Sequence, residues 1–154
     1  MEITQRTATL GDAGVLLNWR NNPSAREYSL HSEVIPIDEH LKWLSERLER
    51  VRLEPFFLFT IDDKAIGMTR LDIITGSNDK FEISILVDPA QQGKGMGTRI
   101  LNMACESFFR VHQNKTIVAR VHKRNLVSQK LFMHSGFKLR DSTDEFLHLE
   151  KSLS

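Results

Sequence analysis

The chain has 154 residues, a formal net charge of +1 and a single cysteine, Cys105. This length predicts one domain, residues 1–154, that can bury a substantial core. The nearly balanced charge argues against general attraction to nucleic acid or to a membrane surface. A lone cysteine excludes an internal disulfide, and neither a membrane-spanning apolar run nor the apolar core of a signal peptide is present. We therefore expect a cytoplasmic protein with no nucleic-acid and no membrane partner.

The first third of the chain predicts a short strand followed by two helices. Residues 2–7 read as the strand. Thr9 and Asp12 then have the spacing of a capping box, with Asp in place of the usual Glu or Gln, and open a helix that runs through Trp19. Pro23 follows, and we expect residues 24–33 to form a polar loop. A second helix from about Asp38 is predicted by apolar residues at helical spacing, namely Leu41, Leu44, Leu48 and Val51.

The rest of the chain alternates between strands and helices. Apolar segments at 56–61, 65–73 and 81–87 are separated by polar turns and predict an antiparallel meander. A helix from the glycines near 95, a strand at 116–121, a helix at 126–134 and strands at 137–139 and 145–149 follow. This order, βααβββαβαββ, predicts an α/β fold with a mixed sheet of about six to seven strands and about four helices. The strands at 81–87 and 116–121 should be parallel neighbours, joined by a right-handed crossover.

Three glycines, Gly93, Gly95 and Gly97, lie in the turn between the strand at 81–87 and the following helix. Without a Cβ atom, they let the backbone approach a ligand closely. The first N–H groups of a helix have no intrahelical partner and carry positive potential, so the turn favours a phosphate group. A Walker loop is excluded because Asp88 stands where its first glycine belongs, and the dinucleotide fingerprint is excluded because the glycines follow G-x-G-x-G. We therefore predict a phosphorylated cofactor of another kind.

Two motifs resemble the core of the GNAT acetyltransferase superfamily over about residues 80–139. Gln92, Gly95 and Gly97 fill the pattern Q/R-x-x-G-x-G/A of its pyrophosphate loop. The second motif, N-x-x-A/S-x-x-L-Y/F-x-x-x-G-F, is matched by the segment from Asn125 to Phe137. They occur in the family's order, separated by one helix and one strand. The resemblance implies acetyl-CoA as cosubstrate, and the histidines show no metal-ligand spacing, so we expect no metal.

The resemblance also implies which residues contact acetyl-CoA. In the family, the strand before the glycine turn splays from its neighbour, which would free the backbone N–H groups near Leu86 and Val87 for the thioester and the pantetheine arm. From the second motif, Asn125 would bind the pantetheine arm, and it also has the position of an N-cap. The remaining expected contacts are those of the turn and of the second motif: Gln92, Gly93, Lys94, Gly95, Met96, Gly97, Thr98, Ser128 and Phe132.

Acetyl transfer to an amine needs a group that removes a proton from the nucleophile. Glu82 is the first candidate for this base, because several GNAT enzymes place a glutamate at that position. The alternative is that Glu82 is a solvent-exposed strand residue without a catalytic role. Ser84, two residues on and on the same face, could relay the proton through water. Many relatives carry a proton-donating tyrosine where this chain has Phe132, which leaves a dedicated acid in question. Tyr28 could reach the site as that acid, or it could pack or contact substrate.

The N-terminal half resembles the nucleotide-sugar N-acetyltransferases of the pseudaminic-acid pathway. The resemblance is carried by Trp19-Arg-Asn-Asn-Pro23 and by Arg26, Ser29, Ile35, Glu39, His40 and Trp43. It implies a small-molecule amine acceptor, the 4-amino group of a UDP-linked 4-amino-4,6-dideoxy sugar. The residues expected to bind it are Arg20, Asn21, Arg26, Tyr28 and His31. Arg20, Arg26 and His31 would serve the diphosphate; the alternative is ordinary surface charge.

Two further functions stay open at this point. The W-R-N segment also occurs in GNAT branches that acetylate protein N-termini, so a ribosomal-protein type of acceptor is the main alternative. A non-catalytic acyl-CoA binding module is the second, and Phe132 is the residue that favours it. A homodimer formed through the sheet edges is compatible with the predicted fold.

Overall fold

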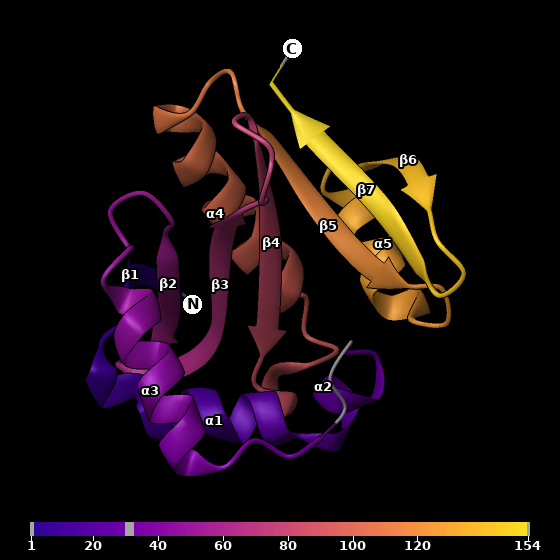
Figure 1. The fold of residues 1–154 in the computed structure, drawn as a ribbon. Helices are drawn as coiled ribbons and strands as arrows, with labels where there is room; N and C mark the ends of the chain where they lie inside the picture. The colour runs from indigo at the N-terminus through magenta and orange to yellow at the C-terminus, as the bar shows by residue number, and fades with distance from the viewer. Residues whose placement is uncertain (1, 30–32, 154) are drawn as a thin grey trace.

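The computed structural model describes residues 2–29 and 33–153. Its centre is a seven-stranded mixed sheet with the strand order β1-β2-β3-β4-β5-β7-β6 (Figure 1). Only β4 and β5 are parallel, and all other neighbours are antiparallel. The strands are β1 (Thr4–Thr7), β2 (Phe56–Ile61), β3 (Lys64–Ile73), β4 (Lys80–Val87), β5 (Thr116–His122), β6 (Lys138–Ser142) and β7 (Phe146–Ser152). The predicted mixed sheet and its parallel pair are confirmed.

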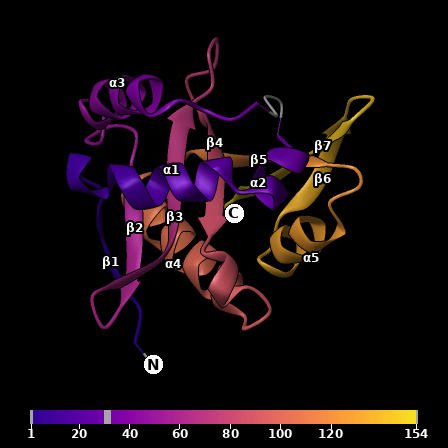
Figure 2. The same cartoon turned by 90° about the horizontal axis from the view of Figure 1, so that it is seen from below.

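Helices cover both faces of the sheet, as Figure 2 shows most clearly. One face carries α1 (Ala13–Asn21), α2 (Pro23–Glu27) and α3 (Ile37–Leu48), and the other carries α4 (Met96–Val111) and α5 (Leu126–His134). Short 3₁₀ turns, η1 (Leu10–Asp12) and η2 (Pro89–Gln91), precede α1 and α4. None of the helices in the described ranges is both long and apolar enough to cross a membrane.

The helix α2 is the element that differs from the sequence prediction, which placed a loop there. Pro23 takes the first helical position, where a missing N–H costs nothing. Asn22 caps the helix, because its side-chain oxygen accepts a hydrogen bond from Ser24 N at 3.0 Å. The prolines and polar residues that suggested a loop therefore start a short helix, and the described chain has five α-helices instead of about four.

The core has two parts, one on each face of the sheet. On the α4 face, Phe81 and Ile83 of β4 pack with Ile100 and Phe108. On the α1 and α3 face, buried residues of the two helices pack on β2 and β3, among them Leu16, Trp19, Leu44, Leu58 and Met68. Side chains of a strand point to alternate faces, so Glu82, Ser84 and Leu86 of β4 point toward the side of α1.

The two parallel strands separate after a short shared stretch. Residues 80–82 of β4 pair with residues 116–118 of β5, and no pairing continues beyond them. From there β5 stays with β7, with which it pairs along its whole length. The carboxyl ends of β4 and β5 consequently diverge, and α2 lies near the opening (Figure 1).

Candidate active site

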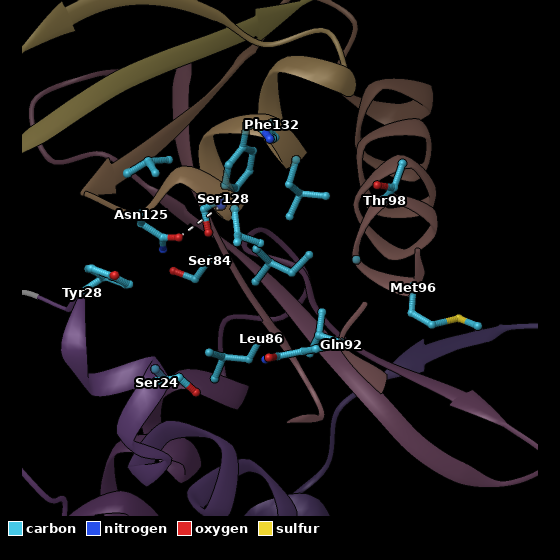
Figure 3. A pocket seen from close by; sticks show the side chains of 18 of the residues that line it. Ser24, Tyr28, Ser84, Leu86, Gln92, Met96, Thr98, Asn125, Ser128 and Phe132 are labelled. Carbon is cyan, nitrogen blue, oxygen red and sulfur yellow. Dashed lines mark hydrogen bonds between the residues drawn. The ribbon is translucent and has the colours of Figure 1, made fainter. Parts of the chain in front are cut away.

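A cavity of about 650 Å³ lies where β4 and β5 separate. On one side its walls come from α1 and α2. On the other they come from the C-terminal part of β4 (residues 82–87), the glycine turn, the start of α4, the end of β5 and α5 (Figure 3). Most of the residues expected to bind acetyl-CoA line it, namely Leu86, Val87, Gln92, Gly93, Gly95, Met96, Gly97, Thr98, Asn125, Ser128 and Phe132. Glu82, Ser84 and Tyr28 line it as well. Lys94 is exposed on the turn and does not reach it.

The hydrogen bonds at both ends of the β3–β4 pairing establish which backbone groups of β4 are free. Asp88 N donates to Ile66 O at 2.8 Å, and Ile74 N donates to Lys80 O at 3.1 Å. Both pairs continue the register of the antiparallel ladder. In such a ladder, directly opposed residues alternate between bonded and non-bonded pairs. The even-numbered residues of β4 are therefore the ones that bond to β3, and the odd-numbered ones turn their N–H and C=O groups toward β5.

The separation of β5 leaves the last odd-numbered groups of β4, those of Ile85 and Val87, facing the gap. Of the two donors expected from sequence, Val87 is placed to bind a ligand through its N–H. Leu86 is an even-numbered residue, opposite Met68, so its N–H is used in the sheet and only its side chain lines the cavity. A strand with free backbone groups is suited to bind an extended amide-containing chain by hydrogen bonds.

The glycine turn presents a row of unused N–H groups. Gly93 and Gly95 have φ values of 80° and 75°, which a residue with a side chain rarely adopts, and Gly95 is the N-cap of α4. Within the described part of the chain, no hydrogen bond is formed by the N–H groups from Gly93 to Thr98. A Cβ atom at either glycine would meet nothing within 4 Å, so the space outside the turn is open. These features fit a diphosphate group at the start of α4.

The second motif builds the opposite wall from α5. The side-chain oxygen of Asn125 accepts a hydrogen bond from Ser128 N at 3.2 Å and so caps α5 (Figure 3). Phe132 is 4% exposed and packs edge to face on Phe137, with ring centroids 5.1 Å apart. The N-cap role of Asn125 is thus present, and its amide also lines the cavity. Phe132 presents only its ring, which has no proton to donate.

Glu82 forms an ion pair that the sequence did not suggest. Its Oε1 atom lies 3.5 Å from Arg120 Nη1 on β5, and both side chains are 31% exposed. Arg120 lines the cavity too, and its guanidinium also lies 5.4 Å from the ring centroid of Phe146. The partnership depends on the β4–β5 register, which no local pattern reports. Ser84, two residues further along β4, lines the same cavity as this ion pair, and Figure 3 shows its hydroxyl there.

Tyr28 meets His122 at the side of the cavity nearest α2. Their ring centroids are 5.4 Å apart. His122 Nδ1 accepts a hydrogen bond from Arg124 N at 3.1 Å, so the proton of the neutral ring is on Nε2. Tyr28 thus reaches the cavity from the end of α2, and among residues 2–29 and 33–153 no hydrogen bond to its hydroxyl group is formed.

Three other residues expected to bind the acceptor, Arg20, Asn21 and Arg26, do not line the cavity. Arg20 lies over the ring of Trp43, 4.2 Å from its centroid. Asn21 holds Ile35 by two hydrogen bonds, one from its Nδ2 to Ile35 O at 3.0 Å and one from Ile35 N to its Oδ1 at 2.8 Å. Arg26 Nε donates to Asn21 O at 3.0 Å. His31 lies outside the described residues. Arg20 and Arg26 thus have different neighbours, and the cationic cluster of Arg20, Arg26 and His31 stays a prediction.

No group of three or more His, Cys, Asp and Glu side chains that could hold a metal ion occurs in residues 2–29 and 33–153.

Comparison with known proteins agrees with this geometry. The family described as Acetyltransferase (GNAT) domain matches residues 3–138. The probable N-acetyltransferase YjcK of Bacillus subtilis (strain 168) is 34% identical over 94 residues, which are 60% of this chain and 52% of YjcK. This chain thus spans about half the length of that curated relative.

Solved structures share the whole fold. Spermidine N-acetyltransferase from Vibrio cholerae, in complex with CoA and spermine, superposes with a TM-score of 0.83 at 22% identity, covering 97% of this chain and 94% of that one. An N-acetyltransferase from Staphylococcus aureus Mu50 gives a TM-score of 0.81 at 22% identity, with 100% of both chains covered.

Proposed function

Since the chain belongs to the GNAT acetyltransferase family, we propose that it moves an acetyl group from acetyl-CoA to a primary amine, the 4-amino group of a UDP-linked amino-dideoxy sugar. The observation that carries the first part is the gap between β4 and β5, with free N–H groups on β4 and on the glycine turn. Acetyl-CoA supplies the activated acetyl group, and residues of this chain bind the cosubstrate, orient the acceptor and accept the proton.

In the proposed reaction, the diphosphate of the cosubstrate binds the N–H groups from Gly93 to Thr98. The pantetheine arm pairs with Val87 and runs along β4 toward the point where the strands separate. The Ile85 N–H, which lies nearer to that point, donates to the carbonyl oxygen of the thioester as negative charge develops there, a contact worth about 2.7–4 kcal/mol in comparable sites. Glu82 accepts the proton that the amine loses when its nitrogen attacks the carbonyl carbon, directly or through Ser84. The carbon–sulfur bond then breaks and the CoA thiolate leaves.

The lining of the acceptor side supports an uncharged, hydroxyl-rich acceptor near the reacting amine. Ser24, Tyr28, Ser84 and Asn22 supply polar groups there. Among the described residues that line the cavity, Glu82 is the only carboxylate, and Arg120 is its partner. A polycation such as spermine would need several carboxylates, so this lining favours a sugar amine.

The test is a panel of acceptors with the purified protein, with release of the CoA thiol measured over time. We expect turnover with the UDP-linked 4-amino sugar, and values of kcat/KM at least tenfold lower with spermine and with ribosomal-protein N-terminal peptides. Turnover with a peptide alone would reject the sugar in favour of the protein N-terminal reaction. Binding of acetyl-CoA without turnover of any amine would support the acyl-CoA binding module.

Glu82→Gln tests the assignment of the base. We expect kcat/KM to fall by about 10²- to 10⁴-fold, the usual contribution of a general base, and the pH dependence of kcat/KM to change. Glu106→Gln is the matched control, because Glu106 is an exposed residue of α4 that pairs with Arg110 on the surface. If Glu82→Gln keeps the rate and the pH profile of the original protein, Glu82 is not the base. The cytoplasmic location and the homodimer stay predictions from sequence.

A further inference from the structure

Two arginines from distant parts of the chain lie against one indole ring beside the cavity. The guanidinium carbon of Arg20, at the end of α1, is 4.2 Å from the ring centroid of Trp43. The guanidinium carbon of Arg70, on β3, is 5.2 Å from the same centroid. Trp43 itself packs on Phe56 with a centroid separation of 6.1 Å, so the ring is anchored in the core. The Trp43 ring is thus a shared cation–π partner of both guanidinium groups.

The positive charge of this pair is not balanced by nearby carboxylates. Within the described residues, no Asp or Glu forms an ion pair with Arg20; Glu39 acts on it only through the longer-range electrostatic field. Arg70 pairs with Asp72, but Asp72 also pairs with the buried Arg47 at 2.7 Å. One carboxylate therefore serves two arginines. Burial, and then the charge of Arg70, lower the pKa of Arg20.

A neutral histidine fixes the position of Arg20. His40 Nε2 donates to Ala13 O at 3.1 Å, so its Nδ1 is the atom that accepts the hydrogen bond from Arg20 Nη1, also at 3.1 Å. This bond uses one donor of the guanidinium and adds no negative charge. Arg20 is thus held in place while the rest of its hydrogen-bonding fork stays available to a ligand.

The pair adjoins the acceptor side of the proposed active site. Arg70 is directly opposite Ser84 in the β3–β4 ladder, and Asp72 is directly opposite Glu82. Directly opposed residues place their side chains on the same face of a sheet. Ser84 lines the cavity, and so does Trp19, which precedes Arg20. An acceptor bound over Ser84 therefore has Arg70 on the adjacent strand and Arg20 on α1 next to Trp19.

We propose that Arg20 and Arg70, held on Trp43, form an anion subsite that binds a phosphate group of the acceptor. The inference rests on the proposed function, because it assigns the place of the acceptor's diphosphate. Planar guanidinium forks bind phosphate oxygens in pairs, which suits two adjacent arginines with unused donors. The subsite takes the role that the sequence assigned to Arg20, Arg26 and His31, with Arg70 as the partner of Arg20.

The experiment measures binding of UDP and of inorganic pyrophosphate to the protein by calorimetry. The protein is first saturated with CoA, so that the glycine turn is occupied and cannot take up the probe. We expect UDP to bind the original protein, and Arg20→Gln and Arg70→Gln each to weaken that binding by about tenfold or more. The affinity for CoA should stay unchanged in both variants. Arg52→Gln, at an exposed arginine after α3, is the matched control and should bind UDP like the original protein.

Arg70→Gln removes the ion pair with Asp72 and could therefore destabilise the fold. Arg70→Lys is the second variant, because lysine can keep an ion pair with Asp72. Lysine keeps the charge but not the planar fork, so UDP binding should still weaken, with the unfolding midpoint unchanged. Unchanged UDP binding in Arg20→Gln and Arg70→Lys, or no binding of either probe to the CoA-loaded original protein, overturns the subsite. If pyrophosphate binds but UDP does not, the result supports an anion subsite and contradicts a nucleoside diphosphate as its ligand. If the UDP-linked sugar is acetylated while both variants keep its KM, the proposed function stands and the subsite is rejected.

Discussion

Arg47 and His40 are polar residues of α3 that lie in the interior of the protein, with 1% and 0% of their surface exposed. Arg47 donates to Glu54 O at 2.7 Å, to Leu71 O at 3.0 Å and to the carboxylate of Asp72. A buried charge is tolerated only when such partners replace water. His40 is satisfied differently, as a neutral ring between Ala13 O and Arg20. These residues join α3 to α1 and to β3 next to the active site.

The protonation of His40 should make stability depend on pH. Burial, followed by the charge of Arg20, lowers the pKa of His40 from its ordinary value of 6.5. Below about pH 6.5 the unfolded chain takes up a proton that the folded protein refuses. The free energy of unfolding should therefore fall as pH decreases from about 6.5 to the lower folded-state pKa, and His40→Gln should lose this part of the dependence.

Urea unfolding between pH 5 and pH 8 measures this effect. His134→Gln, at an exposed histidine of α5, is the control and should keep the pH dependence of the original protein. A His40→Gln variant that loses as much stability between pH 7 and pH 5 as the original protein would contradict the assignment of His40 as a neutral, buried hydrogen-bond partner.

The glycine turn is the element on which cosubstrate binding depends. It follows η2, which connects it to β4, and ends at Gly95, the N-cap of α4. Asp88 stabilises its first residues, because its carboxylate accepts a hydrogen bond from Ala90 N at 2.9 Å. The turn thus brings residues with unused N–H groups to the cavity, and a Cβ atom at Gly93 or Gly95 would meet nothing within 4 Å.

Gly95→Ala tests whether the left-handed conformation of this turn is needed for acetyl-CoA binding. A residue other than glycine in the left-handed conformation at φ 75° costs about 1–2 kcal/mol, and the new methyl group would stand where the diphosphate approaches. We expect lower stability and an affinity for acetyl-CoA reduced by about tenfold, measured by urea unfolding and calorimetry.

Gly14→Ala is the matched control for that substitution. Gly14 lies within α1, where an added Cβ meets nothing within 4 Å and φ is not positive. It should raise stability by about 0.4–1 kcal/mol and leave acetyl-CoA binding unchanged. If Gly95→Ala binds acetyl-CoA with the same affinity as the original protein, the turn does not contact the cosubstrate.

At the scale of the whole molecule, the site exists because β4 and β5 pair over only part of their length. β5 is paired to β7 over seven residues but to β4 over only three. The gap between β4 and β5 therefore opens at the ends of these strands, where α2, the glycine turn and α5 converge. Free backbone groups, the Glu82–Arg120 pair and the aromatic residues Tyr28 and His122 meet only there.

Amide hydrogen exchange, followed by NMR, should report this architecture as an alternation along β4. The N–H groups of Ile85 and Val87 face the gap and should exchange quickly in the free protein. Those of Ser84 and Leu86 are bonded to β3 and should exchange slowly, which makes them the internal controls. Acetyl-CoA should slow exchange at Ile85 and Val87 by at least tenfold. Equal protection of all four amides in the free protein would contradict the gap.

Local patterns were sufficient to predict most elements of this protein, with α2 as an exception. The helix at residues 126–134 has the predicted bounds, because Asn125 caps it and Gly136 follows its last turn. The glycine turn was predictable for the same reason: the residues that shape it are neighbours in the sequence. The loop expected at 24–33 was partly wrong, since Pro23 and Asn22 favour a helix start as readily as a turn.

The contacts of the site were decided by the tertiary structure. Whether Glu82 meets Arg120, and whether Arg20 meets Arg70 or Arg26, depends on strand register and on the position of α3 over the sheet. The amino-acid sequence by itself determined the order of strands and helices, the turn for the diphosphate and the family, because these depend on short-range spacing. Glu82 and Arg120 are 38 residues apart and Arg20 and Arg70 are 50 residues apart, so only the packing of distant segments brings the members of each pair together, and the sequence alone leaves many such pairs equivalent.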